Sequence, residues 1–221
     1  MKKALLLALV LVVPAVAYLV LQTGENRYEP LPVIGPREPV VRVVNGKSVV
    51  DTVYHTVGDF NLIDSDSLPI TQAVARGKIS VVDFFFSTCA TICPKMSNQM
   101  MRVQHKFKDD KDVVILSFTV DPTNDTPSRL KAYGKEHQAI SGKWFFITGE
   151  KEQIYRLAKE SYFLNALETP EATEAFLHSE KFMLIDKQGR IRGIYDGTEH
   201  FEVKRLIEDI EALQQEVSEV R

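Results

Sequence analysis

The sequence of 221 residues predicts an α/β domain built from layers of helices on a sheet. Residues Ile79–Phe86 and Val113–Val120 are almost uninterrupted apolar runs, the pattern of strands that are covered on both faces. A stretch with helical character follows each run, and a hairpin pattern with a final amphipathic helix closes the chain. With 44% hydrophobic residues, the chain is long enough for one well-packed domain and an appendage.

Residues 1–22 are predicted to be a transmembrane anchor, because residues 4–21 are apolar over about the length that crosses a bilayer. Lysines before this run and glutamates after it favour a cytoplasmic N-terminus and an exported body. Ala15-Val16-Ala17 also fits the cleavage pattern of a signal peptide, so secretion after cleavage is the alternative. We expect a bacterial inner-membrane protein whose domain faces the periplasm or the outside.

Residues 23–39 are a polar linker that contains Pro30, Pro32, Pro36 and Pro39. Such spacing favours an extended, semi-rigid tether that holds a domain off the membrane, although simple connection is an equal interpretation. The folded domain is expected to occupy residues 40–221.

The domain is expected to begin with a β-hairpin. Val40–Val44 and Ser48–Val53 are β-branched runs on either side of Asn45-Gly46, a dipeptide suited to a type I′ turn. Val57–Leu62 is predicted to be another short strand.

The central part alternates strands and helices. Ile79–Phe86 is a predicted strand, and a helix from Cys93 to His105 follows it, with Pro94 acceptable in the first turn. Val113–Val120 is the next strand. Thr126 and Pro127 look like the N-cap and first residue of a helix that ends near Glu136.

The last part is predicted to begin with a strand at Trp144–Thr148 and a helix at Glu150–Tyr162, followed by a polar and acidic loop at Asn165–Leu177. A hairpin of two strands, Phe182–Asp186 and Ile191–Tyr195, and a terminal helix at Glu199–Val217 complete the prediction.

The net charge of −3 and the lack of a lysine- or arginine-rich stripe argue against a nucleic-acid partner. The chemistry therefore has to come from individual side chains.

The chain has two cysteines, Cys89 and Cys93, which directly follow a predicted strand and begin a predicted helix. On a helix this spacing puts both side chains on one side, with β-carbons about 5–6 Å apart. A helix N-terminus stabilises a thiolate through its dipole and free N–H groups, so at least one thiol should be acidified. The pair can form a disulfide or place two thiolates on one metal ion.

A purely structural disulfide would suit an exported protein, but a bridge across so short a loop removes little entropy from the unfolded chain. Thiolates are soft ligands that select copper(I) or zinc. Structural zinc normally has four protein ligands. Two sulfur atoms and one histidine therefore fit copper more readily than zinc.

His178 is the candidate third ligand, because it ends the polar loop just before the last hairpin. His55, His105, His137 and His200 are interpreted as ordinary structural or surface residues. Asp121 and Asp125 could orient an imidazole or serve as hard ligands to copper(II). Loop and capping chemistry is the competing interpretation, favoured for Asp125 and left open for Asp121.

The ordered motifs of the chain resemble those of the Sco/SenC family over residues 57–210. They are Cys89-x-x-x-Cys93-Pro94, Val120-Asp121-Pro122, Asp125-Thr126-Pro127, Trp144…Thr148-Gly149, His178-Ser179, Leu184-Ile185-Asp186, Gly189, Arg192-Gly193 and Tyr195-Asp196-Gly197. One departure is Ala90, where the family often has proline after the first cysteine.

The resemblance implies a thioredoxin-like fold with a membrane anchor, and one copper ion bound by Cys89, Cys93 and His178. It implies a role in assembling the dinuclear copper centre of cytochrome c oxidase. The expected partner is the copper-bearing subunit of the oxidase, with another copper chaperone or a thiol reductase as further partners.

Two functions follow from these residues. The first is a copper metallochaperone, in which the loop 165–177 gates release. The alternative is an enzyme, a thiol–disulfide reductase that keeps the cysteines of the target copper site reduced, with Cys89 and Cys93 as the redox-active pair. A redox or copper sensor ranks last, because the sequence offers no separate output domain.

Overall fold

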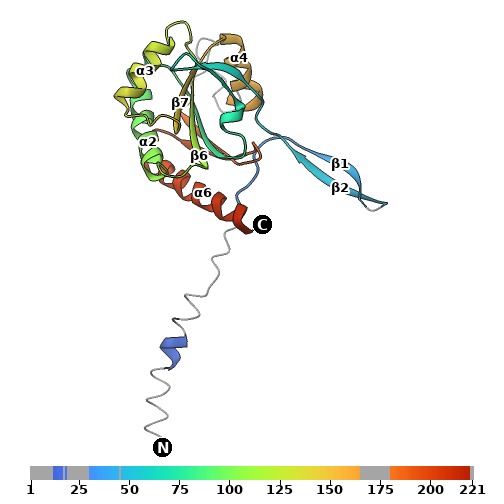
Figure 1. Ribbon diagram of the computed structural model, residues 1–221. Helices are drawn as coiled ribbons and strands as arrows, with labels where there is room; N and C mark the ends of the chain where they lie inside the picture. Colours follow the sequence, from blue (N-terminus) through green and yellow to red (C-terminus); the bar gives the residue numbers. More distant parts are fainter. Residues whose placement is uncertain (1–11, 17, 19–29, 45, 165–179, 220–221) are drawn as a thin grey trace, which may run out of the picture. The chain divides into compact units, whose positions relative to one another are not determined.

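The computed structural model describes residues 12–16, 18, 30–44, 46–164 and 180–219 (Figure 1). The chain divides into two compact units, residues 1–30 and 31–221. In the first unit, residues 12–16 and 18 are helical, and the rest of the predicted anchor lies outside the described residues. No helix within the described ranges is long and apolar enough to cross a membrane.

The second unit contains a seven-stranded sheet with the strand order β4-β3-β7-β6-β5-β8-β9. The strands are β3 Asn61–Asp64, β4 Pro69–Thr71, β5 Ile79–Phe85, β6 Val113–Thr119, β7 Trp144–Thr148, β8 Lys181–Ile185 and β9 Ile191–Asp196. The helical segments are η1 Gln72–Val74, α2 Cys93–Lys106, α3 Pro127–Glu136, α4 Lys151–Arg156, the π-helical turn η2 Leu157–Ser161 and α6 His200–Glu219. The central sheet flanked by helices confirms the predicted α/β class.

The sheet is mixed. Strands β5, β6 and β7 run parallel, whereas β8 is antiparallel to β5 and β3 is antiparallel to β7. Parallel neighbours need a crossover connection, and α2 and α3 supply the two crossovers. The dithiol segment is the start of the first crossover, at the carboxyl end of β5.

Each face of the sheet carries its own apolar core. On one face, Val81 and Phe85 of β5 pack with residues of α2, α3 and α6. On the other, Val82 and Phe84 pack with residues of α4 and η2. Every residue of β5 and β6 is buried, which is why these two strands have predominantly apolar sequences.

The predicted N-terminal hairpin is confirmed. Strands β1 Arg37–Val44 and β2 Lys47–Tyr54 form a separate two-stranded antiparallel sheet, seen as the blue ribbon in Figure 1. Its valine side chains are largely exposed; Val43 is 72% exposed and Val50 is 68% exposed. The hairpin therefore contributes little to the core of the domain.

Two predicted elements differ from the structure. The predicted strand Val57–Leu62 is wrong over its first four residues, because β3 begins at Asn61. Val57 and Phe60 are buried core residues, but the Val57 N–H donates to the Gly189 carbonyl rather than to a neighbouring strand. Their apolar character reflects core contacts rather than strand pairing.

The predicted helix Glu150–Tyr162 is α-helical only to Arg156 and continues as the π-helical turn Leu157–Ser161. The short strand β4 has no counterpart in the prediction. The predicted loop Asn165–Leu177 lies outside the described residues.

Candidate metal centre

The dithiol lies where β5 passes into α2. Strand β5 ends at Phe85, Cys89 follows in the connecting loop, and Cys93 is the first residue of α2 with Pro94 in its first turn. The N-cap residue Ile92 makes no side-chain hydrogen bond to the helix start. Instead, the Cys93 N–H donates to Sγ of Cys89 at 3.4 Å, so a sulfur atom accepts from the first turn.

The two thiols are free and differ in exposure. Cys93 is 1% exposed and packs in the core beneath α2, whereas Cys89 is partly exposed. Sγ of Cys89 also lies 3.7 Å from Oγ1 of Thr91. One sulfur atom is therefore accessible from solvent while the other faces the protein interior.

This asymmetry separates the two pKa values. For Cys89, burial works to raise the pKa, but hydrogen bonds from the Cys93 and Thr91 backbone outweigh it and lower the pKa to about 7. For Cys93, burial raises the pKa to about 12, and the nearby Cys89 and Asp83 add to the shift. At neutral pH the exposed sulfur has substantial thiolate character and the buried one holds its proton.

Asp125 fastens the loop that leads to Cys89. Its carboxylate is fully buried and accepts hydrogen bonds from the Ser87 N–H at 3.0 Å and from the Ser87 hydroxyl. It also accepts from Thr119 Oγ1 at 2.5 Å, at the end of β6. The carboxylate thus joins the ends of β5 and β6 next to the dithiol, which supports loop chemistry rather than metal ligation for Asp125.

Asp121 lies in the same loop, and its side chain is more exposed than that of Asp125. Its Oδ2 accepts from the Asn124 side chain at 2.8 Å, and its carbonyl accepts from the Asp125 N–H. These are turn contacts, so among the described residues Asp121 too is engaged by its own loop.

A buried carboxyl that the sequence analysis did not single out lies under the dithiol segment. Asp83 of β5 is 5% exposed and accepts a 2.5 Å hydrogen bond from the Ser117 hydroxyl, which in turn accepts from Trp144 Nε1 at 2.8 Å. Burial raises the pKa of Asp83 to about 7, while the bond from Ser117 opposes the shift. The only sequence signal was a charged residue inside an otherwise apolar strand.

His178, the predicted third ligand, lies outside the described residues. Of the other four histidines, His105 lies on α2 near the end opposite Cys93, His55 follows β2, His137 follows α3 and His200 begins α6. His55 contacts the Ser161 carbonyl through Nε2 at 2.9 Å. His137 is 7% exposed at the end of α3, and burial lowers its pKa, which disfavours the imidazolium form at this helix end.

Within the described ranges, no three side chains of the histidine, cysteine, aspartate or glutamate type are grouped as a metal ion would require. Cys89 and Cys93 alone supply two sulfur donors on one side of a helix start, a donor pair suited to a soft ion.

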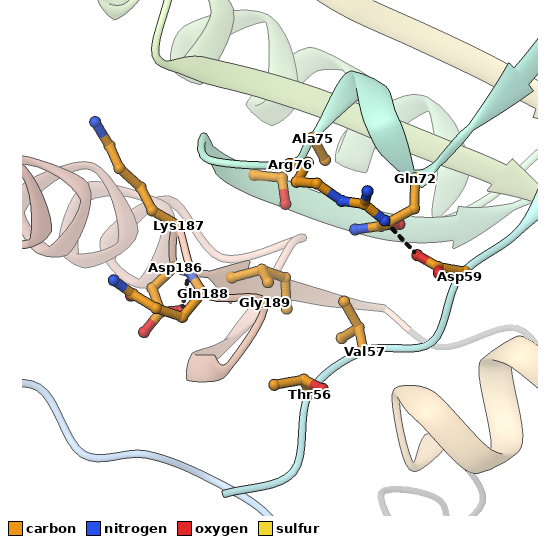
Figure 2. A pocket seen from close by; sticks show the side chains of 12 residues that line it. Thr56, Val57, Asp59, Gln72, Ala75, Arg76, Asp186, Lys187, Gln188 and Gly189 are labelled. Carbon is orange, nitrogen blue, oxygen red and sulfur yellow. Dashed lines mark hydrogen bonds and ion pairs between the residues drawn. The ribbon is translucent and has the colours of Figure 1, made fainter.

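A cavity of about 160 Å³ lies at the other end of β5 (Figure 2). Ser80, at the beginning of β5, and the turn Lys187–Gly189 line it together with the Asp59–Arg76 ion pair. Its lining contains neither a thiol nor an imidazole. This cavity is chemically unsuited to a soft metal and is remote from the dithiol along the strand.

Comparisons of the sequence and of the structure with known proteins find the same family. The SCO1/SenC family model matches residues 50–215. The SCO1 protein homolog of Bacillus subtilis is 30% identical over 169 residues, which cover 76% of this chain and 87% of that protein.

Two solved structures are also similar. BsSco, a member of the Sco family of cytochrome c oxidase assembly proteins with a disulfide switch, superposes with a TM-score of 0.61 at 30% identity, over 73% of this chain and 94% of that one. Arabidopsis thaliana ScoI with copper bound gives a TM-score of 0.56 at 26% identity, over 71% and 99%. The sheet and its flanking helices thus have the thioredoxin-like arrangement of these proteins.

Proposed function

Since the chain belongs to the SCO1/SenC family, we propose that it is a copper metallochaperone that assists assembly of the dinuclear copper centre of cytochrome c oxidase. The observation that carries the proposal is the pair of free thiols at the start of α2, one accessible and acidified, the other buried. The copper bound to Arabidopsis ScoI and the assembly role given to BsSco support it.

In this proposal copper is the cargo. The Cys89 thiolate meets the ion first, because it is accessible and about half of the thiol is deprotonated at neutral pH. Cys93 then releases its proton to become the second ligand, so at pH 7 metal binding releases one proton from Cys93 and about half a proton from Cys89. His178 completes the donor set.

The site also suits release. A buried thiol with a high pKa regains a proton readily, so a partner that offers its own thiolates can take the ion by stepwise ligand exchange. We place this exchange outside the cytoplasm, with residues 1–22 as the membrane anchor and residues 23–30 as the tether, because residues 31–39 belong to the compact unit of the domain.

The test is a copper(I) titration of the reduced full chain in detergent against a chelator of known affinity. Wild type should bind one ion, and His178→Ala should weaken binding by about 10-fold or more. His200→Ala is the matched control, because His200 lies at the start of α6 and contacts Arg102 instead. Equal affinity in wild type and His178→Ala would remove His178 from the site.

The contrast between the two thiols also favours a second function, a thiol–disulfide reductase. The accessible Cys89 thiolate would attack a target disulfide, forming a mixed disulfide and releasing one target thiolate. Cys93 would then lose its proton and attack Sγ of Cys89, which releases the second target thiolate and leaves the Cys89–Cys93 disulfide. An external thiol reductase would have to return the pair to the reduced state.

The Cys93→Ser variant distinguishes the two functions. As a reductase, it should accumulate a mixed disulfide through Cys89 with an oxidised peptide that carries the cysteine pair of the copper-bearing oxidase subunit. Cys89→Ser is the control and should trap nothing. If Cys93→Ser traps no such adduct, the reductase function is wrong even though copper binding persists in wild type.

A further inference from the structure

We propose that the β1–β2 hairpin is a self-association element, in which the outer edge of β2 pairs antiparallel with β2 of a second copy of this chain. The proposal concerns residues 47–51 and does not depend on copper or on the dithiol. It rests on the hydrogen-bond pattern of the hairpin, on the unequal protection of its two edges and on its charge pattern.

The hairpin is a two-stranded sheet separate from the seven-stranded one. A lone two-stranded ribbon is marginally stable in water, and this one exposes Val41, Val43 and Val50 by 64%, 72% and 68%. These three side chains share one face, because the register places Val41 opposite Val50 and Val43 opposite Ser48. Such a ribbon gains stability from a further strand.

The register fixes which backbone groups point outward. The His55 N–H donates to the Pro36 carbonyl, so residues 36 and 55 are a hydrogen-bonded pair in continuation of the ladder. Since hydrogen-bonded pairs alternate with non-bonded ones, Ser48, Val50 and Thr52 direct their N–H and C=O groups away from β1. In agreement with this, the Thr52 N–H is bonded to the Asp51 side chain at 2.8 Å and not to β1.

The two edges are unequally protected. By the same alternation, Pro39 lies at an outward-facing position of β1, where the missing N–H blocks pairing. The β2 edge has no proline, and Ser48 and Val50 supply complete donor and acceptor pairs. Protection of β1 alone leaves β2 as the edge that can accept a strand.

A two-fold axis at Val49 gives the best register. It pairs Ser48 with Val50 of the second copy, and both are outward-facing residues, so each such pair exchanges two hydrogen bonds. It also sets Lys47 opposite Asp51 of the second copy, and the symmetry produces two such opposite-charge pairs. Val49 of one copy then lies opposite Val49 of the second copy, on the two-fold axis.

Shifting the register by two residues keeps the hydrogen-bond geometry but sets Val50 opposite itself and Lys47 opposite Val53. The two opposite-charge pairs are then lost. The occupant that fits this edge with complementary charges is therefore a second copy in the register centred on Val49.

Disulfide trapping tests this register. In the full chain with Cys89→Ser and Cys93→Ser, in isolated membranes, Val49→Cys should form an intermolecular disulfide under mild oxidation. Opposed non-hydrogen-bonded residues have Cα atoms about 4.5 Å apart, within disulfide range. Val53→Cys is the matched control on the same face, with Val53 44% exposed and Val49 48% exposed. Two copies of residue 53 would be separated by about 27 Å in this register.

A second pair of variants tests the edge itself. Val50→Pro removes an outward N–H of β2, whereas Val41→Pro makes the same change at the directly opposite position of β1. Added to Val49→Cys, Val50→Pro should reduce the cross-linked dimer at least 10-fold, and Val41→Pro should not. Labelling with a bulky maleimide checks that the introduced thiol is accessible in each variant.

The result that overturns the proposal is equal cross-linking at positions 49 and 53, or no cross-linking at position 49 while maleimide labels that thiol. Equal loss with Val41→Pro and Val50→Pro would overturn the edge assignment. A partner strand from a different protein would give no homodimer in any variant, which also rejects the proposal.

Discussion

The Cys93 N–H and the Cys89 Sγ lie 3.4 Å apart, so the first turn of α2 donates to the sulfur atom of the residue four positions before it. Through this contact the first turn of the helix donates a hydrogen bond to the sulfur atom of Cys89 and not to that of Cys93. Cys93 itself is buried beneath the helix, where its anion would be poorly solvated. One backbone bond and one difference in burial thus separate the roles of two neighbouring cysteines.

The first prediction concerns the reactivity of Cys89. A pKa of about 7 instead of the usual 9.0 raises the thiolate fraction at pH 7 about 50-fold. A more acidic thiol is intrinsically less nucleophilic, by about eightfold over this difference. We therefore expect iodoacetamide to alkylate Cys89 about sixfold faster at pH 7 in the folded chain than in urea.

The rate of Cys89 alkylation should increase with pH. Cys89 alkylation should rise through a midpoint near pH 7, because its thiol ionises there. Cys93, with a pKa of about 12 and almost no exposure, should stay unmodified in the folded protein up to at least pH 9. Mass spectrometry of the peptide containing both residues assigns the label, and a midpoint near pH 9 for Cys89 would contradict the assigned hydrogen bonds.

The second prediction concerns Asp125. Asp125→Ala leaves the Ser87 N–H and the Thr119 hydroxyl without their buried acceptor, which should lower the free energy of unfolding by about 3 kcal/mol. Because Ser87 leads to Cys89, the same variant should also alter the alkylation rate of Cys89. Asp121→Ala is the control: within the described ranges its partly exposed carboxylate accepts only from Asn124, so the change should cost less than about 1 kcal/mol.

Urea denaturation of the two variants measures the difference in the free energy of unfolding. If Asp125→Ala is as stable as Asp121→Ala, the carboxylate does not hold the ends of β5 and β6 together. If stability falls but Cys89 reactivity is unchanged, the loop position is set by other contacts.

Much of the fold was predictable because its central strands are buried on both faces. Strands β5 and β6 have predominantly apolar sequences, and Pro94 and Thr126-Pro127 mark helix starts by local chemistry. Strand β4, Pro69–Thr71, is too short to have a detectable period. Val57 and Phe60 gave a strand signal because they are core residues, although they lie in irregular backbone.

The position of the candidate site was predictable from the sequence, but the difference in burial between its two thiols was not. The spacing of Cys89 and Cys93 pointed to a dithiol at a helix start, whereas their different burial depends on tertiary packing. The role of Asp125 depends on Ser87, 38 residues away after β5, and Asp83 is paired with Ser117, 34 residues away. His178 as a ligand stays a prediction, which the copper titration addresses.

The third prediction concerns the pH dependence of stability through Asp83. Burial raises its folded pKa from 3.8 to about 7, so the folded state holds a proton that the unfolded state loses between these values. The stability contribution is complete below pH 4 and is lost as the pH rises to 7, by at most about 4 kcal/mol. Asp83→Asn keeps an acceptor for Ser117 and should flatten this part of the stability curve.

Urea denaturation at a series of pH values between 4 and 8 measures the effect. Asp59→Asn is the control, because the Asp59 side chain is 75% exposed and its charge stays solvated in both states. A wild-type curve and an Asp83→Asn curve with the same slope over this range would show that Asp83 ionises normally in the folded protein.

The fourth prediction concerns Arg192, which joins the end of the linker to the domain. Its side chain is 5% exposed and forms ion pairs with Asp186 at 3.1 Å and Glu216 at 2.8 Å. It also donates to the carbonyls of Leu31 and Pro32, and the Leu31 N–H donates to Glu216. Arg192→Ala leaves Glu216 without its cation and Asp186 with Arg190 alone, so we expect a loss of about 3 kcal/mol in the free energy of unfolding.

Hydrogen exchange separates this local effect from a general loss of stability. Relative to wild type, Arg192→Ala should increase the exchange rate of the Leu31 amide more than the exchange rates of the β5 amides. The reason is that Glu216, the acceptor for the Leu31 amide, loses the cation that holds it in place. Arg190→Ala is the matched control: Arg190 also pairs with Asp186, but its side chain is 28% exposed and does not reach residues 31 and 32, so about 1 kcal/mol is expected. Unchanged exchange at Leu31 in Arg192→Ala would mean that contacts such as the Ile34–Ile191 bridge are sufficient to hold the linker end against β9.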